Sequence, residues 1–193
     1  MSGARGRRAG PGGDAAARIL DAAAGELVRA GAGELSMHEV AARAGVSKGL
    51  IHYHYRDKDA LLAGAAARLG ERIAVRERAL LARATAGTVV EDLRTWIDGE
   101  LAAGDWRALL SLVRWPSGAV APAAARALAE RREEAARIVA RATELLRYRP
   151  RVAPEHLGAL LVAAMHGMAI APEGPAAGSG ADILILALLA MAE

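Results

Sequence analysis

The 193-residue chain has no cysteine, which excludes disulfide bonds, thiolate metal sites and a cysteine nucleophile. Its formal charge of +3 is too small to indicate nucleic-acid binding by itself, so an argument for DNA depends on where the cations lie. The longest unbroken apolar run, residues 183–192, is about half the ~20 residues that a membrane-spanning helix needs. We therefore expect a cytoplasmic protein without a membrane partner.

The composition favours helix nearly throughout, because alanine, leucine and arginine are common and phenylalanine is absent. The length fits a small N-terminal domain and a larger one that share a helical core. Residues 1–13, mostly glycine, alanine and arginine, are expected to form a disordered basic leader. Its arginines either contact DNA or are simply solvated.

The first predicted helix runs from Asp14, as its N-cap, to about Ala30. Gly31 and Gly33 are expected to end it, since glycine accepts the left-handed backbone that often follows a helix. An apolar stripe along this helix would brace the next two helices, which are too short to bury a core alone.

Residues 36–62 contain the most informative pattern in the chain. Ser36 with Glu39 predicts a capping box at the start of one short helix. Gly45 is placed for a tight turn, and Ser47 is a second N-cap. Two short helices joined in this way form a helix-turn-helix, whose second helix is free to enter a major groove.

The second helix begins with a sterically open, donor-rich face. Lys48, Gly49, His52 and Tyr53 are expected to point away from its apolar side, where such residues suit close approach to phosphates and base edges. The alternative is an ordinary helical hairpin with a solvated face.

Asp57 is the predicted N-cap of the next helix, and Lys58 lies in its first turn. A cation is unfavourable there because it opposes the helix dipole. Either a phosphate bound by Lys58 and the free N–H groups compensates, or Lys58 pairs with Asp59 or water.

These residues resemble the N-terminal domain of the TetR (tetracycline repressor) family over about residues 14–62. The resemblance implies an all-helical homodimer that binds a palindromic operator, usually as a repressor released by a small ligand. It assigns DNA contacts to residues of the two short helices and of the following helix start: Ser36, Ser47, Lys48, Gly49, Leu50, His52, Tyr53, His54 and Lys58. His52 departs from the family's usual tyrosine and Tyr55 from its usual phenylalanine. Leu50 is apolar at a position that often reads a base, where it could contact a thymine methyl.

A helical body is predicted for the rest of the chain. Its helices are expected at about residues 60–83, 88–103, 105–113, 122–148, 155–170 and 182–192. Thr88, in a capping box with Glu91, and Asp105 are the expected N-caps. Charged residues between Arg68 and Arg78, and the segment 130–134, are expected to form solvated faces.

The last helix is apolar on all sides, so it must be covered on all sides. One side can pack on its own subunit and the other needs a partner. We therefore predict a homodimer with a two-fold interface of four helices, two from each subunit. Glycine and alanine at Gly158, Ala159, Ala163, Ala164 and Gly167 would let helices approach closely.

All three tryptophans lie in residues 96–115, where they line an apolar ligand cavity or fill ordinary core. An apolar small-molecule effector is the partner expected for such a cavity. His166 is interpreted mainly as a hydrogen-bonded core residue. The candidate ligand-binding residues are Trp96, Glu100, Trp106, Leu109, Arg114, Trp115, Met165 and His166.

No metal site, cofactor or enzyme activity is predicted. His52 and His54 are two residues apart on a helix and point to different faces, and no cysteine or cluster of carboxylates accompanies them. The prediction is an all-α protein with a three-helix helix-turn-helix DNA-binding domain at 14–60 and a ligand-binding and dimerisation domain at 61–193. The alternative is a helical ligand- or partner-binding protein with a vestigial helix-turn-helix.

Overall fold

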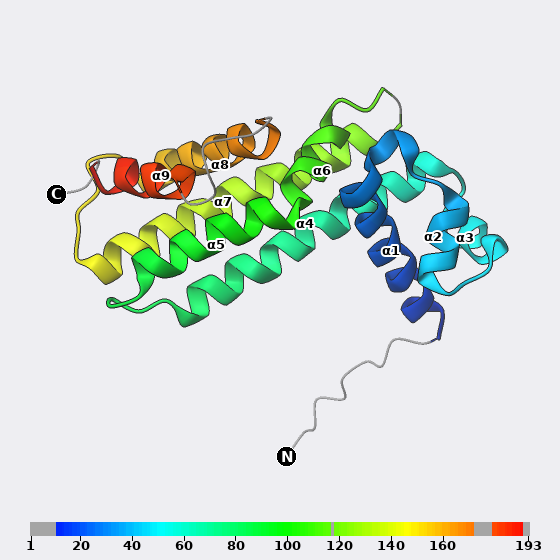
Figure 1. Cartoon of the computed structure of the whole chain (residues 1–193), viewed down its shortest axis with the longest axis horizontal. Coiled ribbons are helices and arrows are strands. Elements are labelled where there is room, and N and C mark those ends of the chain that lie inside the picture. The colour runs from blue at the N-terminus through cyan, green and yellow to red at the C-terminus, as the bar shows by residue number, and fades with distance from the viewer. Residues whose placement is uncertain (1–10, 117, 172–178, 191–193) are drawn as a thin grey trace, which may run out of the picture.

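The computed structural model describes residues 11–116, 118–171 and 179–190, and these fold as nine α-helices (Figure 1). The expected leader, residues 1–13, lies outside the described residues except for the backbone of its last three. Helices α1 to α3 form the N-terminal part, and helices α4 to α9 form the body. The helices are α1 Pro11–Glu34, α2 Met37–Ala44, α3 Lys48–His54, α4 Lys58–Arg83, α5 Val89–Ala103, α6 Asp105–Val113, α7 Val120–Leu146, α8 Pro154–Ile170 and α9 Ser179–Ala190.

Helix α1 begins before the predicted position. Asp14 was expected to cap it, but the helix already starts at Pro11, and exposed Asp14 instead pairs with Arg18 one turn on. The predicted break at Gly31 is confirmed, because this residue has a φ of 83° and a non-helical ψ inside the segment. A proline can occupy the first turn without losing a needed N–H, which explains the earlier start.

The helix-turn-helix forms as predicted. Ser36 Oγ accepts the N–H of His38 at 3.2 Å, two residues on, so the reciprocal box expected with Glu39 is replaced by a simple N-cap. Gly45 adopts the left-handed conformation at φ 63°, which closes α2. Ser47 Oγ then accepts the N–H of Leu50 at 3.2 Å and starts α3.

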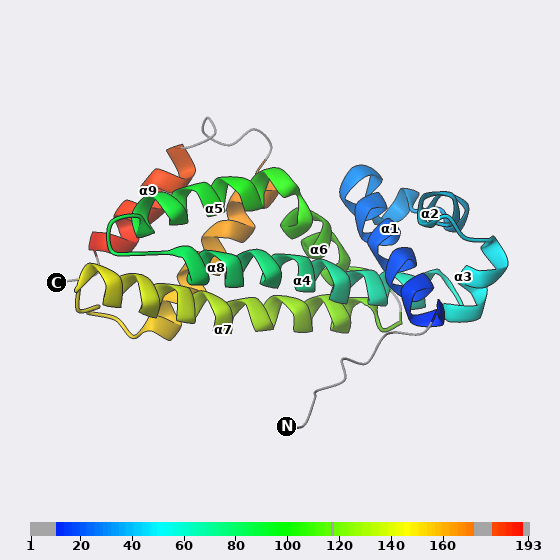
Figure 2. The same ribbon diagram turned by 90° about the horizontal axis from the view of Figure 1, so that it is seen from below.

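Helix α4 runs from the N-terminal part into the body, where it lies beside α7 over much of its length (Figure 2). Asp57 caps it as predicted, accepting the N–H of Ala60 at 2.8 Å. Helix α1 packs on both α4 and α6, and one continuous apolar core joins the N-terminal part to the body. The apolar side of α4, which includes Leu61, Leu69 and Leu80, is buried.

The two caps predicted in the body do not form as side-chain caps, although Thr88 does occupy the N-cap position of α5. The hydroxyl of Thr88 accepts the N–H of Thr85 at 3.2 Å, and Thr85 lies before α5. The predicted capping box of Thr88 with Glu91 therefore does not form. Asp105 is the first residue of α6 and is fully buried, and Gly104, at φ 74°, precedes it. Pairing with arginines of α4 holds the Asp105 carboxylate inside the body instead.

Helix α8 packs closely on α7, and Gly158 makes this possible. A Cβ at Gly158 would lie 2.7 Å from the Cα of Ala136, closer than non-bonded carbon atoms approach. Of the small residues expected to let helices approach, Gly158 therefore serves contact within the chain. Gly167 faces open space, and Ala159 and Ala163 are exposed on the same side of α8.

The two charged segments expected to be solvated are partly buried, which corrects the prediction. Glu77 of α4 is 1% exposed, and Arg131 and Glu134 of the segment 130–134 are 6% and 8% exposed. Arg131 and Glu77 form an ion pair between α7 and α4. In the described residues, no helix is both long and apolar enough to cross a membrane.

Candidate nucleic-acid interface and ligand pocket

Helix α3 presents an exposed face that we call the recognition surface: Lys48, Gly49, His52 and Tyr53. All four residues are exposed, and the ring of Tyr53 is 82% exposed. The opposite side of α3 is anchored by Ile51, which is fully buried against α1 and α2. One apolar side chain thus fixes the helix and leaves its polar side free.

The other predicted DNA contacts are less open. Leu50 and His54 are half-buried, and Ser36 and Ser47 use their hydroxyls as N-caps. The ring of His54 packs edge-on against Tyr53 at 5.2 Å between centroids. Its Nε2 is buried and has no hydrogen-bond partner among the residues that the structure describes. His54 therefore positions Tyr53 rather than extending the exposed face.

Lys58 contacts the end of α1 and the indole ring of Trp115. Its Nζ donates to the carbonyl of Gly33 at 3.0 Å and lies 5.8 Å from the ring centroid of Trp115. The indole N–H of Trp115 in turn donates to Asp59 at 3.0 Å. The end of α1, the start of α4 and the segment after α6 therefore meet at Lys58.

Comparison with known proteins agrees with this geometry. The family model described as "Bacterial regulatory proteins, tetR family" matches residues 19–65, which span α1 to the start of α4. Residues 19–65 are therefore a TetR-family N-terminal domain. Members of this family are DNA-binding transcription regulators, and the match includes the whole recognition surface. No curated protein matches the sequence.

Several solved structures share the fold over nearly the full chain. Reduced Escherichia coli NemR has a TM-score of 0.73 at 13% identity, covering 93% of this chain and 98% of NemR. A transcriptional regulator from Rhodococcus sp. RHA1 has a TM-score of 0.65 at 21% identity, covering 92% and 97%. A Saccharomonospora viridis regulator in complex with choline has a TM-score of 0.66 at 20% identity, covering 92% and 94%.

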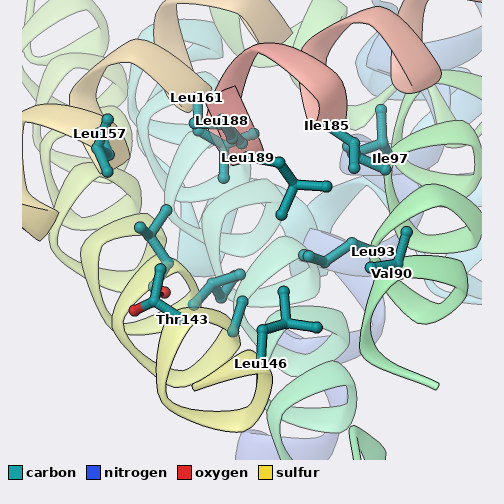
Figure 3. Close-up of a pocket in the computed structure, with 13 residues that line it drawn as sticks. Val90, Leu93, Ile97, Thr143, Leu146, Leu157, Leu161, Ile185, Leu188 and Leu189 are labelled. Atoms are coloured by element: carbon teal, nitrogen blue, oxygen red, sulfur yellow. Dashed lines mark hydrogen bonds between the residues drawn. The ribbon is translucent and has the colours of Figure 1, made fainter. Parts of the chain in front are cut away.

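The body of the protein contains an apolar pocket between α5, α7, α8 and α9 (Figure 3). Its volume is about 40 Å³. Leu93 and Ile97 of α5, Val139 of α7, Leu161 of α8 and Leu188 of α9 are among its walls. Thr143 of α7 is the one residue with a polar side chain among the thirteen that line it.

The eight residues predicted to bind a ligand lie elsewhere. Trp96, Trp106, Leu109 and Met165 are core residues, and none of the eight lines the pocket of Figure 3. Arg114 borders a separate surface hollow with Ile170. The pocket residues could not be predicted, because an apolar side chain that lines a cavity has the same helical spacing as one that fills a core.

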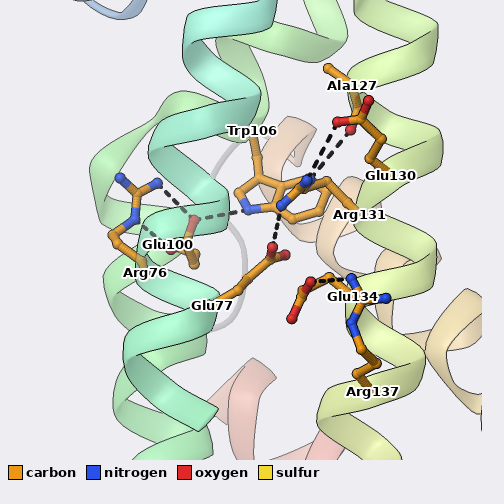
Figure 4. A network of polar contacts seen from close by, with 9 residues as sticks. All are labelled: Arg76, Glu77, Glu100, Trp106, Ala127, Glu130, Arg131, Glu134 and Arg137. Carbon is orange, nitrogen blue, oxygen red and sulfur yellow. Dashed lines mark hydrogen bonds and ion pairs between the residues drawn. The ribbon is translucent and has the colours of Figure 1, made fainter. Parts of the chain in front are cut away.

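Glu100 and Trp106 belong to a buried polar cluster with Arg76 (Figure 4). Asp105 also belongs to this cluster, through its ion pair with Arg76. Arg76 donates to Glu100 Oε2 at 2.9 Å and to Asp105 Oδ2 at 2.8 Å. The indole N–H of Trp106 donates to the same Glu100 oxygen at 3.0 Å. These bonds tie α4, α5 and α6 together, which gives Glu100 and Trp106 a structural role.

His166 contacts the other side of Trp106, with 5.5 Å between ring centroids. The hydrogen bond expected for a core histidine is missing at its buried Nε2, which has no partner among the described residues. Burial lowers the pKa of His166, and the positive charge of Arg132 lowers it further. His166 is therefore held as a neutral ring at neutral pH.

Glu77 and Arg131 form the second polar group of Figure 4. Burial raises the pKa of Glu77 to about 7, with Arg131 opposing the shift and the negative charges of Glu134 and Glu100 adding to it. The carboxyl thus holds its proton more tightly in the folded chain than in the unfolded chain, where its pKa is 4.5. Its stabilising effect is complete below pH 4.5 and is lost as the pH rises through about 7.

We therefore expect Glu77→Gln to change how stability depends on pH. The wild-type free energy of unfolding should lose on the order of 3 kcal/mol from this group between pH 5 and pH 8. Glutamine cannot ionise, so the variant should lose less over the same range. Urea denaturation of both proteins at several pH values measures the difference, in which the titration of His166 cancels. Parallel curves would contradict the raised pKa.

Helices α8 and α9 both leave large aliphatic side chains exposed. Ile183 and Leu186 of α9 are 64% and 65% exposed, and Ile170 of α8 is 63% exposed. Large aliphatic side chains that are exposed to this extent indicate a surface that another molecule covers. The prediction that α9 is left partly uncovered by its own subunit is confirmed.

Proposed function

We propose that the protein is a homodimeric repressor that binds a palindromic DNA operator and leaves it when a small molecule binds. In this proposal residues 14–60 form the DNA-binding domain, and residues 61–193 form the ligand-binding and dimerisation domain. The observation that carries the proposal is the recognition surface, which is held by a buried Ile51 and open to solvent along α3. A vestigial helix-turn-helix would have no reason to keep this surface free.

Each α3 would enter a major groove, with the two copies about 34 Å apart in the DNA-bound dimer. Lys48, His52 and Tyr53 would contact base edges and phosphates, and Gly49 would let the backbone approach. Lys58 and the free N–H groups at the start of α4 would bind a phosphate. Ser36, Ser47, Leu50 and His54 remain proposed contacts that lie at the edges of this surface.

The exposed aliphatic side chains of α8 and α9 support a two-fold interface, because such side chains indicate a surface that another molecule covers. A four-helix contact between two subunits would cover Ile170, Ile183 and Leu186. The ligand would act only by binding one subunit arrangement more tightly than the other. An effector of largely apolar character fits a body whose pocket is lined by apolar residues.

Tyr53→Ala should weaken DNA binding by about tenfold or more, because it removes a large exposed side chain from the centre of the recognition surface. Double-stranded DNA selected from random sequence by the wild-type protein is the ligand, and fluorescence anisotropy measures the affinity. Tyr148→Ala is the matched control, since Tyr148 is also exposed but lies after α7 at the other end of the chain. Equal affinities of the two variants would overturn the assignment of α3.

A further inference from the structure

The pocket between α5, α7, α8 and α9 is lined almost entirely by apolar side chains. Twelve of its thirteen lining residues have purely hydrocarbon side chains, and none is charged. A cavity of this kind stays dry, because water inside it would lack hydrogen-bond partners. Hydrocarbon that enters such a space gains contacts that water cannot supply.

Thr143 limits the polar chemistry of the pocket to one kind of bond. Its hydroxyl hydrogen is already directed at carbonyl groups of its own helix, since Oγ1 lies 3.0 Å from both Val139 O and Ala140 O. The oxygen can therefore only accept a further hydrogen bond. A ligand group placed there has to donate one.

One wall of the pocket is formed by α9, the helix whose outer side is exposed to solvent. Ile185, Leu188 and Leu189 of α9 face the pocket, whereas Ile183 and Leu186 on the outer side of α9 are exposed (Figure 3). A volume of about 40 Å³ holds only a few water-sized spheres, so an organic molecule enters by parting these walls. Helix α9 can move outward most easily, because no other part of the described chain covers its outer side.

We propose that this pocket binds an uncharged, hydrocarbon-rich molecule that donates one hydrogen bond to Thr143 Oγ1, as an alicyclic or aliphatic alcohol would. The inference rests on the proposed function in one respect, namely that a small molecule regulates the protein. Carboxylates are excluded because the pocket offers no cation and no free N–H donor from its side chains. Quaternary ammonium ligands are excluded because it has neither an aromatic ring nor an acidic group.

Binding in this pocket would act directly on the side of α9 that is proposed to contact the second subunit. The same helix supplies one wall of the pocket and the exposed residues Ile183 and Leu186. A ligand that moves α9 outward therefore shifts the surface on which the second subunit would rest. The regulatory signal would pass through the dimer contact, and the distance between the two α3 helices would change with it.

Calorimetric titration of the full-length protein with cyclohexanol, and separately with cyclohexanecarboxylate, tests the proposal without DNA. We expect saturable binding of the alcohol and at least hundredfold weaker binding of the carboxylate. Thr143→Val keeps the shape of the side chain and removes the acceptor, so affinity for cyclohexanol should fall about tenfold. Affinity for methylcyclohexane, which has no polar group, should not fall.

A second pair of variants addresses the location. Ala142→Leu places a larger side chain in the pocket wall and should abolish binding of cyclohexanol, whereas Ala140→Leu makes the same change at an exposed position of α7 and should leave it intact. Thermal denaturation verifies that both variants are folded. Equal binding by the two variants, or equal affinity for alcohol and carboxylate, would overturn the proposal.

The regulated function is tested separately, by the affinity for the selected DNA with and without cyclohexanol. Release of DNA by the alcohol from the Ala140→Leu variant but not from the Ala142→Leu variant supports both proposals. Binding of the alcohol that leaves DNA affinity unchanged supports the pocket and overturns ligand control by this route. Failure to bind any DNA would overturn the proposed function and leave the calorimetric result standing.

Discussion

Replacing Arg131 by alanine is expected to lower the free energy of unfolding by about 3–5 kcal/mol near pH 8. Arg131 is 6% exposed, and its guanidinium pairs with Glu77, which is 1% exposed. The substitution would leave the Glu77 carboxylate buried without a cation, next to the negative charge of Glu134. At pH 5 the carboxyl can remain neutral, so the loss should be smaller there.

Arg132→Ala is the control for this variant, because Arg132 is the next residue of α7 and is exposed. We expect its effect on stability to stay within about 0.5 kcal/mol. Urea denaturation at pH 5 and pH 8 measures all three proteins. A loss for Arg131→Ala that is the same at both pH values would mean that Glu77 does not carry the charge that Arg131 compensates.

Leu186→Glu should convert a dimer into monomers and reduce affinity for a palindromic site by about 10²–10⁴-fold. Leu186 is 65% exposed in the single chain, so the substitution costs the isolated subunit little. In the proposed interface the same carboxylate would be transferred from water into an apolar contact. The DNA affinity falls because, in a dimer, binding of one α3 holds the second α3 close to its half-site. In separate monomers each α3 has to bind independently.

Sedimentation velocity at micromolar concentration reports the assembly state of this variant. Val75→Glu is the matched control, since Val75 is 53% exposed on α4, away from the face formed by α8 and α9. That variant should sediment as the wild type does. A Leu186→Glu protein that still sediments as a dimer and binds DNA normally would place the subunit contact on another surface.

The N-terminal helices could be predicted closely because their signals are local. Ser47, Gly45 and Asp57 act through bonds to residues within five positions, so the sequence around each is enough to place it. The start of α1 was predicted wrongly at Asp14, because several nearby residues could begin this helix and it begins at Pro11. Thr88 was placed correctly as the N-cap residue of α5, but its side chain makes no capping bond to the helix.

The interior of the body could not be predicted to the same degree. Glu77 and Arg131 are 54 positions apart, and the local sequence around each predicts a solvated charged face. Only the packing of α4 on α7 brings them together and buries them. The pocket has the same origin, because its walls come from four helices whose apolar stripes differ in no visible way from ordinary core.

In the proposed DNA complex, Lys58 would link rearrangements of the body to the strength of the phosphate contact. One of its N–H groups is bound to Gly33 and its ammonium rests against Trp115, so a phosphate has to compete with these partners for the cation. Any rearrangement after α6 that moves the indole makes the ammonium more or less available to a phosphate. By reciprocity, occupation of Lys58 by DNA biases the position of Trp115 with the same free energy. A molecule bound far from α3 can thus alter operator affinity with α3 itself unmoved.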